Sequence, residues 1–385
     1  MPYYRSVGDV PRKRHVQFRR PDGRLYAEEL MGEEGFSSDS SLLYHREIPT
    51  RICRAEPAGE DAGPLAPPDT LLPRHLRTHD VSSGGDLALG RTLLLGNAQV
   101  RISYVAATED SPLYRDADGD LVVYVESGTG VLESVFGRLT VGPGDYVVIP
   151  TGTTHRWTVD AGAPLRALVL EARGHVGPPS RYLSDRGQLL EHAPYSERDL
   201  RGPAEPLLVD GGETDVVVRR RGRLTRYTYA SHPFDVVGWD GCLYPYALSI
   251  HDFEPITGRL HQPPPVHQTF AGPGFVVCSF VPRLLDYHPD AVPVPYNHAN
   301  VDSDEVLFYV GGDFTSRSGS GIGMGSISVH PSGFVHGPQP GSVEKALGKE
   351  ATDELAVMVD TFAPLDLAPA AYDIEDPAYP WTWAR

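Results

Sequence analysis

The sequence predicts an all-β protein that contains two barrels, and two observations carry this prediction. Short runs rich in β-branched and aromatic residues recur between turns that contain glycine or proline, which is typical of strands. The pattern Gly-(x)5-Pro-x-Gly-x-x-His also occurs twice, ending at His155 and at His336. A chain of 385 residues is long enough for two domains of ordinary size, so we expect each copy of the pattern to mark one barrel.

We expect residues 1–80 to form an irregular arm that packs on the first barrel. The basic cluster within residues 12–20 is typical of solvated surface or of a subunit contact. The first barrel and a linker then fill residues 81–230. Run length and β-branched content predict strands at Gln99–Val105, Leu121–Val125, Gly130–Phe136, Asp145–Pro150 and Leu165–Leu170.

The remaining residues, 231–385, are expected to form the second barrel. Phe275–Val281 has the composition of the strand that opens it, and Leu355–Phe362 that of its last strand. An extension containing proline and tryptophan follows and closes the barrel. Helices should be few and short, and Ser196–Leu200 in the linker is the clearest candidate.

A second spacing precedes the pattern that ends at His336. It is His298-x-Asn300-(x)4-Glu305-(x)6-Gly312, and together the two spacings are the two motifs of a cupin barrel. Two imidazoles and one carboxylate then meet inside the barrel, a set that suits Fe(II) because it leaves coordination positions open for substrate and dioxygen. Manganese, nickel or zinc would also fit. The alternative is a degenerate barrel in which His298 and His336 are hydrogen-bonded core residues.

The first barrel lacks the matching first motif. The segment Arg115–Asp120 stands where the histidines of that motif would be, which leaves His155 without imidazole partners. We therefore expect a structural first barrel in which His155 only forms hydrogen bonds, and a metal site in the second barrel alone.

Composition excludes several classes of partner and compartment. The formal net charge of −17 argues against nucleic acid or an anionic membrane surface. Cys53, Cys242 and Cys278 form no Cys-x-x-Cys pair, so neither a disulfide framework nor a zinc knuckle is indicated. No apolar run approaches the ~18 residues of a membrane span, and the N-terminus lacks the apolar region of a signal peptide. These features predict a cytoplasmic protein.

Several segments resemble the homogentisate 1,2-dioxygenase family in its shorter bacterial form. The segments that carry the resemblance are Tyr3–Gly8, Pro11–His15, Asp116–Asp120, His232–Trp239 and the His330-(x)5-His336-Gly-Pro motif. The resemblance covers most of the chain and is strongest in the second barrel. It implies two cupin barrels, an Fe(II) cofactor, a homo-oligomer, and ring cleavage of homogentisate to maleylacetoacetate in tyrosine and phenylalanine catabolism.

The resemblance also implies roles for individual residues. The iron ligands of the family fall on His298, Glu305 and His336. The family spaces its histidine and glutamate one residue closer, so Asp304 competes with Glu305, although the cupin spacing favours Glu305.

The catalytic base of the family falls on His261, with His267 as the weaker candidate. His330 is expected either to donate a proton during catalysis or only to orient His336. Three histidines outside the ligand set, His261, His267 and His330, are thus candidates for a role in proton transfer.

The substrate contacts are expected at His336, Phe314 and Arg317. The family has a tyrosine where this chain has Phe314, so gentisate or another substituted hydroquinone is an alternative substrate. Arg317 is the nearest cation in sequence to the motifs and would bind a carboxylate, although an arginine in a turn is also typical of plain surface. A bicupin that binds metal without catalysis is the remaining alternative.

Overall fold

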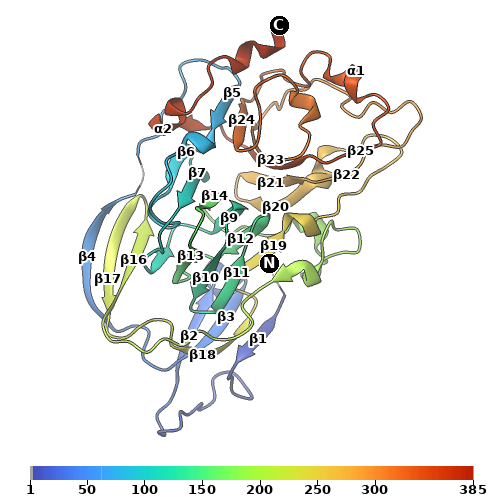
Figure 1. Ribbon diagram of the computed structural model, residues 1–385. Coiled ribbons are helices and arrows are strands. Elements are labelled where there is room, and N and C mark those ends of the chain that lie inside the picture. The colour runs from blue at the N-terminus through green and yellow to red at the C-terminus, as the bar shows by residue number, and fades with distance from the viewer. Residues whose placement is uncertain (1–2, 62, 385) are drawn as a thin grey trace.

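The computed structural model describes residues 3–61 and 63–384, which form two adjacent β barrels (Figure 1). Residues 1–2 and 62 of the expected arm and residue 385 of the expected extension lie outside the described part of the chain. The barrels and the short helices confirm the predicted all-β bicupin fold. Among the described residues, every helix falls short of the length and apolar character needed to cross a membrane.

Two large sheets build the first barrel, drawn mainly in green in Figure 1. The seven-stranded sheet has the order β11-β10-β13-β8-β16-β17-β4, and the eight-stranded sheet has the order β15-β19-β12-β9-β14-β7-β6-β27. Leu132 and Trp157 of one sheet pack against Val123 and Val147 of the other to form its core.

The seven-stranded sheet contains β4 (Ile52–Glu60), β8 (Tyr114–Asp116), β10 (Gly130–Ser134), β11 (Gly137–Val141), β13 (His155–Val159), β16 (Thr214–Arg220) and β17 (Arg223–Tyr229). The eight-stranded sheet contains β6 (Thr92–Gly96), β7 (Val100–Ala107), β9 (Leu121–Ser127), β12 (Asp145–Ile149), β14 (Leu165–Ala172), β15 (Leu200–Arg201), β19 (Tyr246–Ser249) and β27 (Asp366–Leu367).

The second barrel lies toward the C-terminus, in gold and orange in Figure 1. Its six-stranded sheet has the order β20-β21-β26-β23-β24-β5, and a two-stranded sheet pairs β22 with β25. These strands are β5 (Arg74–Arg77), β20 (Gln268–Gly272), β21 (Phe275–Phe280), β22 (Arg283–Leu284), β23 (Asp304–Gly311), β24 (Ser326–His330), β25 (Ala351–Thr352) and β26 (Leu355–Thr361).

A four-stranded sheet, β1-β18-β3-β2, joins the N-terminal arm to the middle of the chain. Its strands are β1 (Arg5–Gly8), β2 (Ala27–Gly32), β3 (Ser40–His45) and β18 (Val236–Gly241). The α-helices are α1 (Ser342–Ala346) and α2 (Pro369–Asp373). The 3-10 helices are η1 (Glu34–Phe36), η2 (Thr78–Asp80), η3 (Ser180–Tyr182), η4 (Glu197–Asp199), η5 (Ile250–Asp252), η6 (Pro264–His267), η7 (Thr315–Arg317) and η8 (Tyr379–Ala384).

The two barrels exchange strands, which the sequence does not indicate. β5 belongs to the expected N-terminal arm but pairs with β24 of the second barrel, whereas β27 follows the second barrel but pairs with β6 of the first. Both added strands cover what would otherwise be the open edge of a sheet. β20 also precedes β21, so the second barrel opens one strand earlier than expected.

Aromatic side chains connect the two cores. Tyr104 packs against Phe308 with ring centroids 6.1 Å apart, and Tyr146 packs against Phe270 at 5.6 Å. The Tyr146 hydroxyl also shares a 2.8 Å hydrogen bond with that of Ser279. The barrels therefore share one continuous hydrophobic cluster, which supports the strands that carry the candidate site.

Candidate active site

Backbone pairing in the second barrel brings the two histidine motifs together. His298 and His336 form an isolated antiparallel bridge in which each amide donates to the other's carbonyl at 2.8 Å. Glu305 lies on β23, and antiparallel pairing sets it directly opposite His330 on β24. His298 and His336, 38 positions apart in sequence, thus become neighbours through this bridge, and the pairing of β23 with β24 places Glu305 in the same barrel sheet as His330.

The side chains of His298, Glu305 and His336 converge. His298 Nε2 lies 3.6 Å from Glu305 Oε2, and His336 Nε2 lies 3.5 Å from Glu305 Oε1. One potential ligand atom from each residue lies within 4.8 Å of the other two. Glu305 and His336 are buried and His298 is partly exposed, so the cluster is open on the side of His298.

The state of His336 shows that a metal ion fits this cluster. Its Nδ1 donates to the carbonyl of Phe334 at 3.1 Å, which leaves Nε2 as the ring nitrogen that can bind a metal ion. Nε2 is buried without a hydrogen-bond partner and lies 3.5 Å from Glu305 Oε1. A metal ion between this nitrogen and the carboxylate would satisfy both groups. The set of two imidazoles and one carboxylate suits Fe(II).

The structure separates Glu305 from Asp304, the competing carboxylate. Asp304 Oδ1 accepts the amide hydrogen of Ser332 at 2.7 Å, and Oδ2 accepts that of Leu365 at 2.8 Å. Both oxygens of Asp304 are therefore occupied by backbone hydrogen bonds. Of the two carboxylates, Glu305 is the one that lies in the cluster with the two histidines.

His330 supports the cluster through Glu305. Its Nδ1 donates to Glu305 Oε1 at 2.8 Å, and the Tyr379 hydroxyl donates to its Nε2 at 3.1 Å. Burial, aided by the charge of Arg317, lowers the pKa of His330 to about 3, so the ring is neutral. Burial would raise the pKa of Glu305, but the surrounding histidines lower it well below the usual range and keep it ionised.

A cavity of about 260 Å³ extends from this cluster. His298, Glu305 and Asn300 contribute polar groups to its wall. The rest of the wall is largely apolar and includes Phe280, Leu285, Pro293, Val294, Leu307 and Met358. A single substituted aromatic ring is the kind of ligand that this lining favours.

His261 lies on the cavity wall, and each of its ring nitrogens faces a polar group. Its Nδ1 is 3.4 Å from Asp286 Oδ2, and the Tyr296 hydroxyl lies 3.3 Å from its Nε2. The side chain is 40% exposed, so a ligand in the cavity has access to it. The Tyr296 ring in turn meets the ring of His298 edge-on, with centroids 5.7 Å apart.

His267, the other histidine expected as a possible base, has a different environment. It is buried and stacks on Phe280 with centroids 4.6 Å apart. Burial and then the charge of Arg283 lower the pKa of His267 to about 3. The ring is therefore a poor proton acceptor at neutral pH, which favours His261 as the base.

Of the three expected substrate contacts, Arg317 lines the cavity and Phe314 lies next to it, while His336 belongs to the cluster described above. Arg317 is buried and lines the cavity, but Nε donates to the Tyr309 hydroxyl at 3.0 Å and Nη1 to the Gly337 carbonyl at 2.7 Å. Phe314 packs edge-on against Tyr309 in a hydrophobic cluster next to the cavity, with centroids 4.9 Å apart.

Sequence reasoning missed several residues of this site. Asp360 pairs with Glu305 across β26 and β23, and its Oδ1 is buried without a partner. Burial and then the charge of Glu305 raise the pKa of Asp360 to about 7. Tyr296 could have been noticed because it lies two residues before His298, whereas neither Asp360 nor Tyr379 belongs to a motif.

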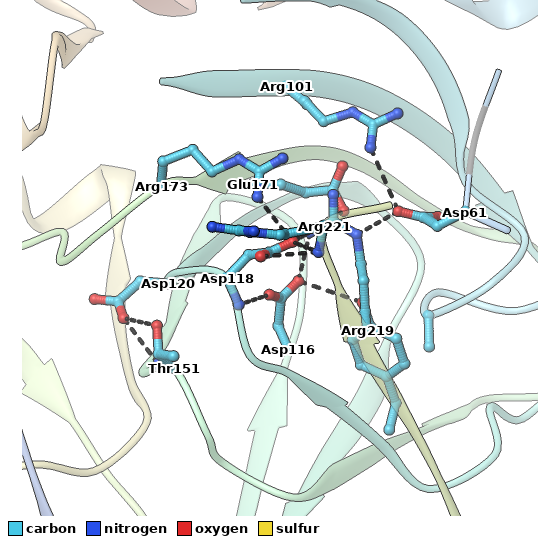
Figure 2. Close-up of polar contacts among 12 residues, drawn as sticks. Asp61, Arg101, Asp116, Asp118, Asp120, Thr151, Glu171, Arg173, Arg219 and Arg221 are labelled. Atoms are coloured by element: carbon cyan, nitrogen blue, oxygen red, sulfur yellow. Dashed lines mark hydrogen bonds and ion pairs between the residues drawn. The ribbon is translucent and has the colours of Figure 1, made fainter. Parts of the chain in front are cut away.

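In the first barrel, ion pairs surround the segment that replaces the missing motif, as Figure 2 shows. Arg219 is 1% exposed and lies 2.9 Å from Asp116 and 3.6 Å from Asp118. Arg173 binds Asp118 at 2.8 Å. His155 donates from Nδ1 to the Thr153 carbonyl at 3.0 Å. Asp116 and Asp118 are thus both paired with arginines.

The fold and this geometry define a bicupin protein with a cluster of two histidines and one carboxylate in its second barrel. A family model described as "Homogentisate 1,2-dioxygenase N-terminal" matches residues 91–250. A Saccharolobus solfataricus protein described as a "Putative dioxygenase" is 42% identical over 389 residues, covering 100% of this chain and 99% of its own length. The chain therefore belongs to the homogentisate 1,2-dioxygenase family, a family of dioxygenases.

Two further matches are more distant. Homogentisate 1,2-dioxygenase of Rhodopseudomonas palustris is 26% identical over 373 residues, covering 88% of this chain and 81% of its own. The solved structure of a cupin 2 conserved barrel domain protein from Leptotrichia buccalis is 11% identical, with a TM-score of 0.34 and coverage of 76% of this chain and 98% of its own.

Proposed function

We propose that this protein is an Fe(II)-dependent dioxygenase that cleaves the ring of homogentisate to maleylacetoacetate. The observation that carries the proposal is the convergence of His298, Glu305 and His336 beside a cavity that also holds His261. Family membership supports the class of reaction, and the 26% identity to a homogentisate dioxygenase supports the substrate. Both atoms of dioxygen enter the product, so the reaction needs no external reductant.

His298, Glu305 and His336 would hold the iron, which supplies open coordination positions for the substrate and dioxygen. His330 fixes the carboxylate of Glu305, and the Phe334 carbonyl fixes the ring of His336. Both contacts orient donor atoms before a metal binds, as partners of metal ligands commonly do.

His261 removes a proton from a ring hydroxyl of the substrate. Asp286 faces its Nδ1, which leaves the lone pair on Nε2 directed toward the Tyr296 hydroxyl. A phenol ionises near pH 10, so a positioned imidazole is needed to deprotonate it at neutral pH. The charge of Arg317 on the cavity wall favours a substrate that carries a carboxylate.

Gentisate or another substituted hydroquinone is the second candidate. Phe314 stands where the family has a tyrosine and offers no hydroxyl, and the relative that is 42% identical is described only as a dioxygenase. The test is oxygen uptake by Fe(II)-loaded protein with homogentisate, gentisate and unsubstituted hydroquinone. We expect the highest kcat/KM for homogentisate. A higher value for another ring would change the substrate, and tight iron binding without any oxygen uptake would favour a non-enzymatic protein.

A further inference from the structure

A second arginine, Arg283 at the start of β22, lines the same cavity. Its guanidinium lies over the Phe280 ring, 5.7 Å from the centroid, and Nη1 donates to the Val281 carbonyl at 3.1 Å. Within the described part of the chain, Arg283 forms no ion pair with any carboxylate. The other donors of its guanidinium are therefore free for a ligand.

Arg283 is partly buried and has no carboxylate within ion-pairing distance among the described residues. Burial lowers the pKa of Arg283 even though the charges of Glu354 and Asp286 act in the opposite direction. A guanidinium that has lost water without gaining a close carboxylate is stabilised by a ligand that brings one. Glu354 and Asp286 repel such a ligand. Its carboxylate must therefore form close bidentate hydrogen bonds with Arg283 to outweigh this repulsion.

The remaining cations on the wall are already engaged. Lys349 donates to Asp313 Oδ2 at 2.7 Å and to the Thr315 hydroxyl at 3.0 Å. Arg317 donates to Tyr309 and Gly337, as described above. Arg283 is thus the cavity cation with the most unused hydrogen-bonding capacity.

His267 adds a second unsatisfied polar group beside Arg283. It stacks on the same Phe280 ring, and its Nδ1 is buried without a hydrogen-bond partner. Its low pKa keeps the ring neutral, so it adds no charge that would compete for the ligand. The wall beside Arg283 therefore offers a flat aromatic surface, which suits the ring of an aromatic acid.

We propose that Arg283 binds the carboxylate of the substrate and thereby selects aromatic acids over neutral hydroquinones. The inference rests on the proposed function, since it takes the ring to be bound beside His298 and Glu305. It assigns direct contact with the carboxylate to Arg283 and leaves Arg317 as a buried charge that supports the wall.

The test compares binding of two ligands to Fe(II)-loaded protein under anaerobic conditions by titration calorimetry. Homogentisate carries a carboxylate, and methylhydroquinone has the same hydroxyls without one. We expect Arg283→Met to weaken homogentisate binding roughly 10- to 100-fold and to leave methylhydroquinone binding unchanged. Lys349→Met is the matched control, because it removes one positive charge from the same wall, and it should bind both ligands as the wild type does.

Equal losses for both ligands would make Arg283 a structural residue, and no loss would also overturn the inference. If Arg283→Met does not fold, Arg283→Lys serves instead. This variant keeps the positive charge but cannot form the bidentate hydrogen bonds. It should show a smaller loss of affinity, confined to homogentisate.

The outcomes separate this inference from the proposed function. Oxygen uptake with homogentisate by a wild type whose Arg283→Met variant binds equally well would overturn the inference alone. Selective loss of homogentisate binding without any oxygen uptake by the wild type would overturn the proposed function alone. Failure of the wild type to bind homogentisate would overturn both.

Discussion

Glu305 and His330 pair directly across β23 and β24, and His330 Nδ1 donates to Glu305 Oε1 at 2.8 Å. The register of two antiparallel strands thus determines the orientation of the carboxylate that faces His298 and His336. Tyr379 of the C-terminal extension completes this chain of hydrogen bonds from the other side of His330.

Replacement of His330 should therefore weaken metal binding although His330 is not itself in the ligand set. His330→Leu removes the donor to a buried carboxylate, and we expect a loss of roughly 1–3 kcal/mol in the free energy of unfolding together with lower metal content. Metal analysis and urea denaturation measure both effects. Tyr379→Phe, which removes only the outer hydrogen bond, should cause a smaller loss. A His330→Leu variant that retains a full metal complement and wild-type stability would contradict this role.

The two adjacent carboxylates should respond differently to substitution. Glu305→Ala removes a ligand, so we expect it to lose iron. Asp304→Asn should keep iron but lower the free energy of unfolding by about 1–3 kcal/mol, because Asp304 accepts the amides of Ser332 and Leu365. Metal content and thermal unfolding of the two purified variants separate these effects. Loss of iron in Asp304→Asn with its retention in Glu305→Ala would reverse the assignment.

Substitution of His261 should affect turnover rather than metal binding. His261→Asn removes the titrating ring but keeps much of its volume, and we expect kcat to fall roughly 100- to 10,000-fold with iron content unchanged. Single-turnover kinetics with anaerobically bound substrate measures the effect directly. Asp286→Asn, which leaves His261 in place but weakens its orientation, should give a smaller decrease. Undiminished turnover by iron-loaded His261→Asn would move the base to another residue.

A buried histidine that does not line the cavity, His45, should make stability depend on pH. His45 donates to Asp235 at 2.6 Å and to Glu29 at 2.8 Å. Burial opposes the charged form, but these hydrogen bonds prevail and raise the pKa of His45 from 6.5 to about 9. Because the folded-state pKa is raised, the stabilisation is complete below about pH 6.5 and is lost as the pH rises through about 9.

Chemical denaturation between pH 6 and pH 10 tests this prediction. The wild type should lose stability over that range, whereas His45→Gln should be less stable at pH 6 and show a flatter profile. His15→Gln, at an exposed histidine that also pairs with a glutamate, should follow the wild type. Parallel profiles for wild type and His45→Gln would show that the pH dependence comes from other groups.

Local patterns in the sequence predicted much of this structure. The strands expected at Phe275–Val281 and Leu355–Phe362 match β21 and β26, because β-branched runs of that length favour strands. The spacing of the cupin motifs also predicted that His298, Glu305 and His336 would converge.

The rest depends on contacts that no local pattern encodes. The pairing of β5 with β24 joins segments about 250 residues apart, and the hydrogen bond from Tyr379 to His330 comes from the far end of the chain. Arg283 belongs to no sequence motif. It stands out only because it lines the cavity and forms no ion pair among the described residues. Sequence spacing therefore predicted which three residues converge, but not the residues that support them or the cavity wall beside them.

Metal stoichiometry measured together with oxygen uptake shows whether the cluster in the second barrel binds the iron that ring cleavage requires. Wild type, His298→Ala, His336→Ala and the double variant would be loaded with Fe(II), freed of excess metal, and assayed with homogentisate. We predict one iron per chain in the wild type, oxygen uptake in proportion to iron content, and loss of both in the double variant. Two irons per chain, or one iron and full oxygen uptake in the folded double variant, would show that iron binds elsewhere in the chain.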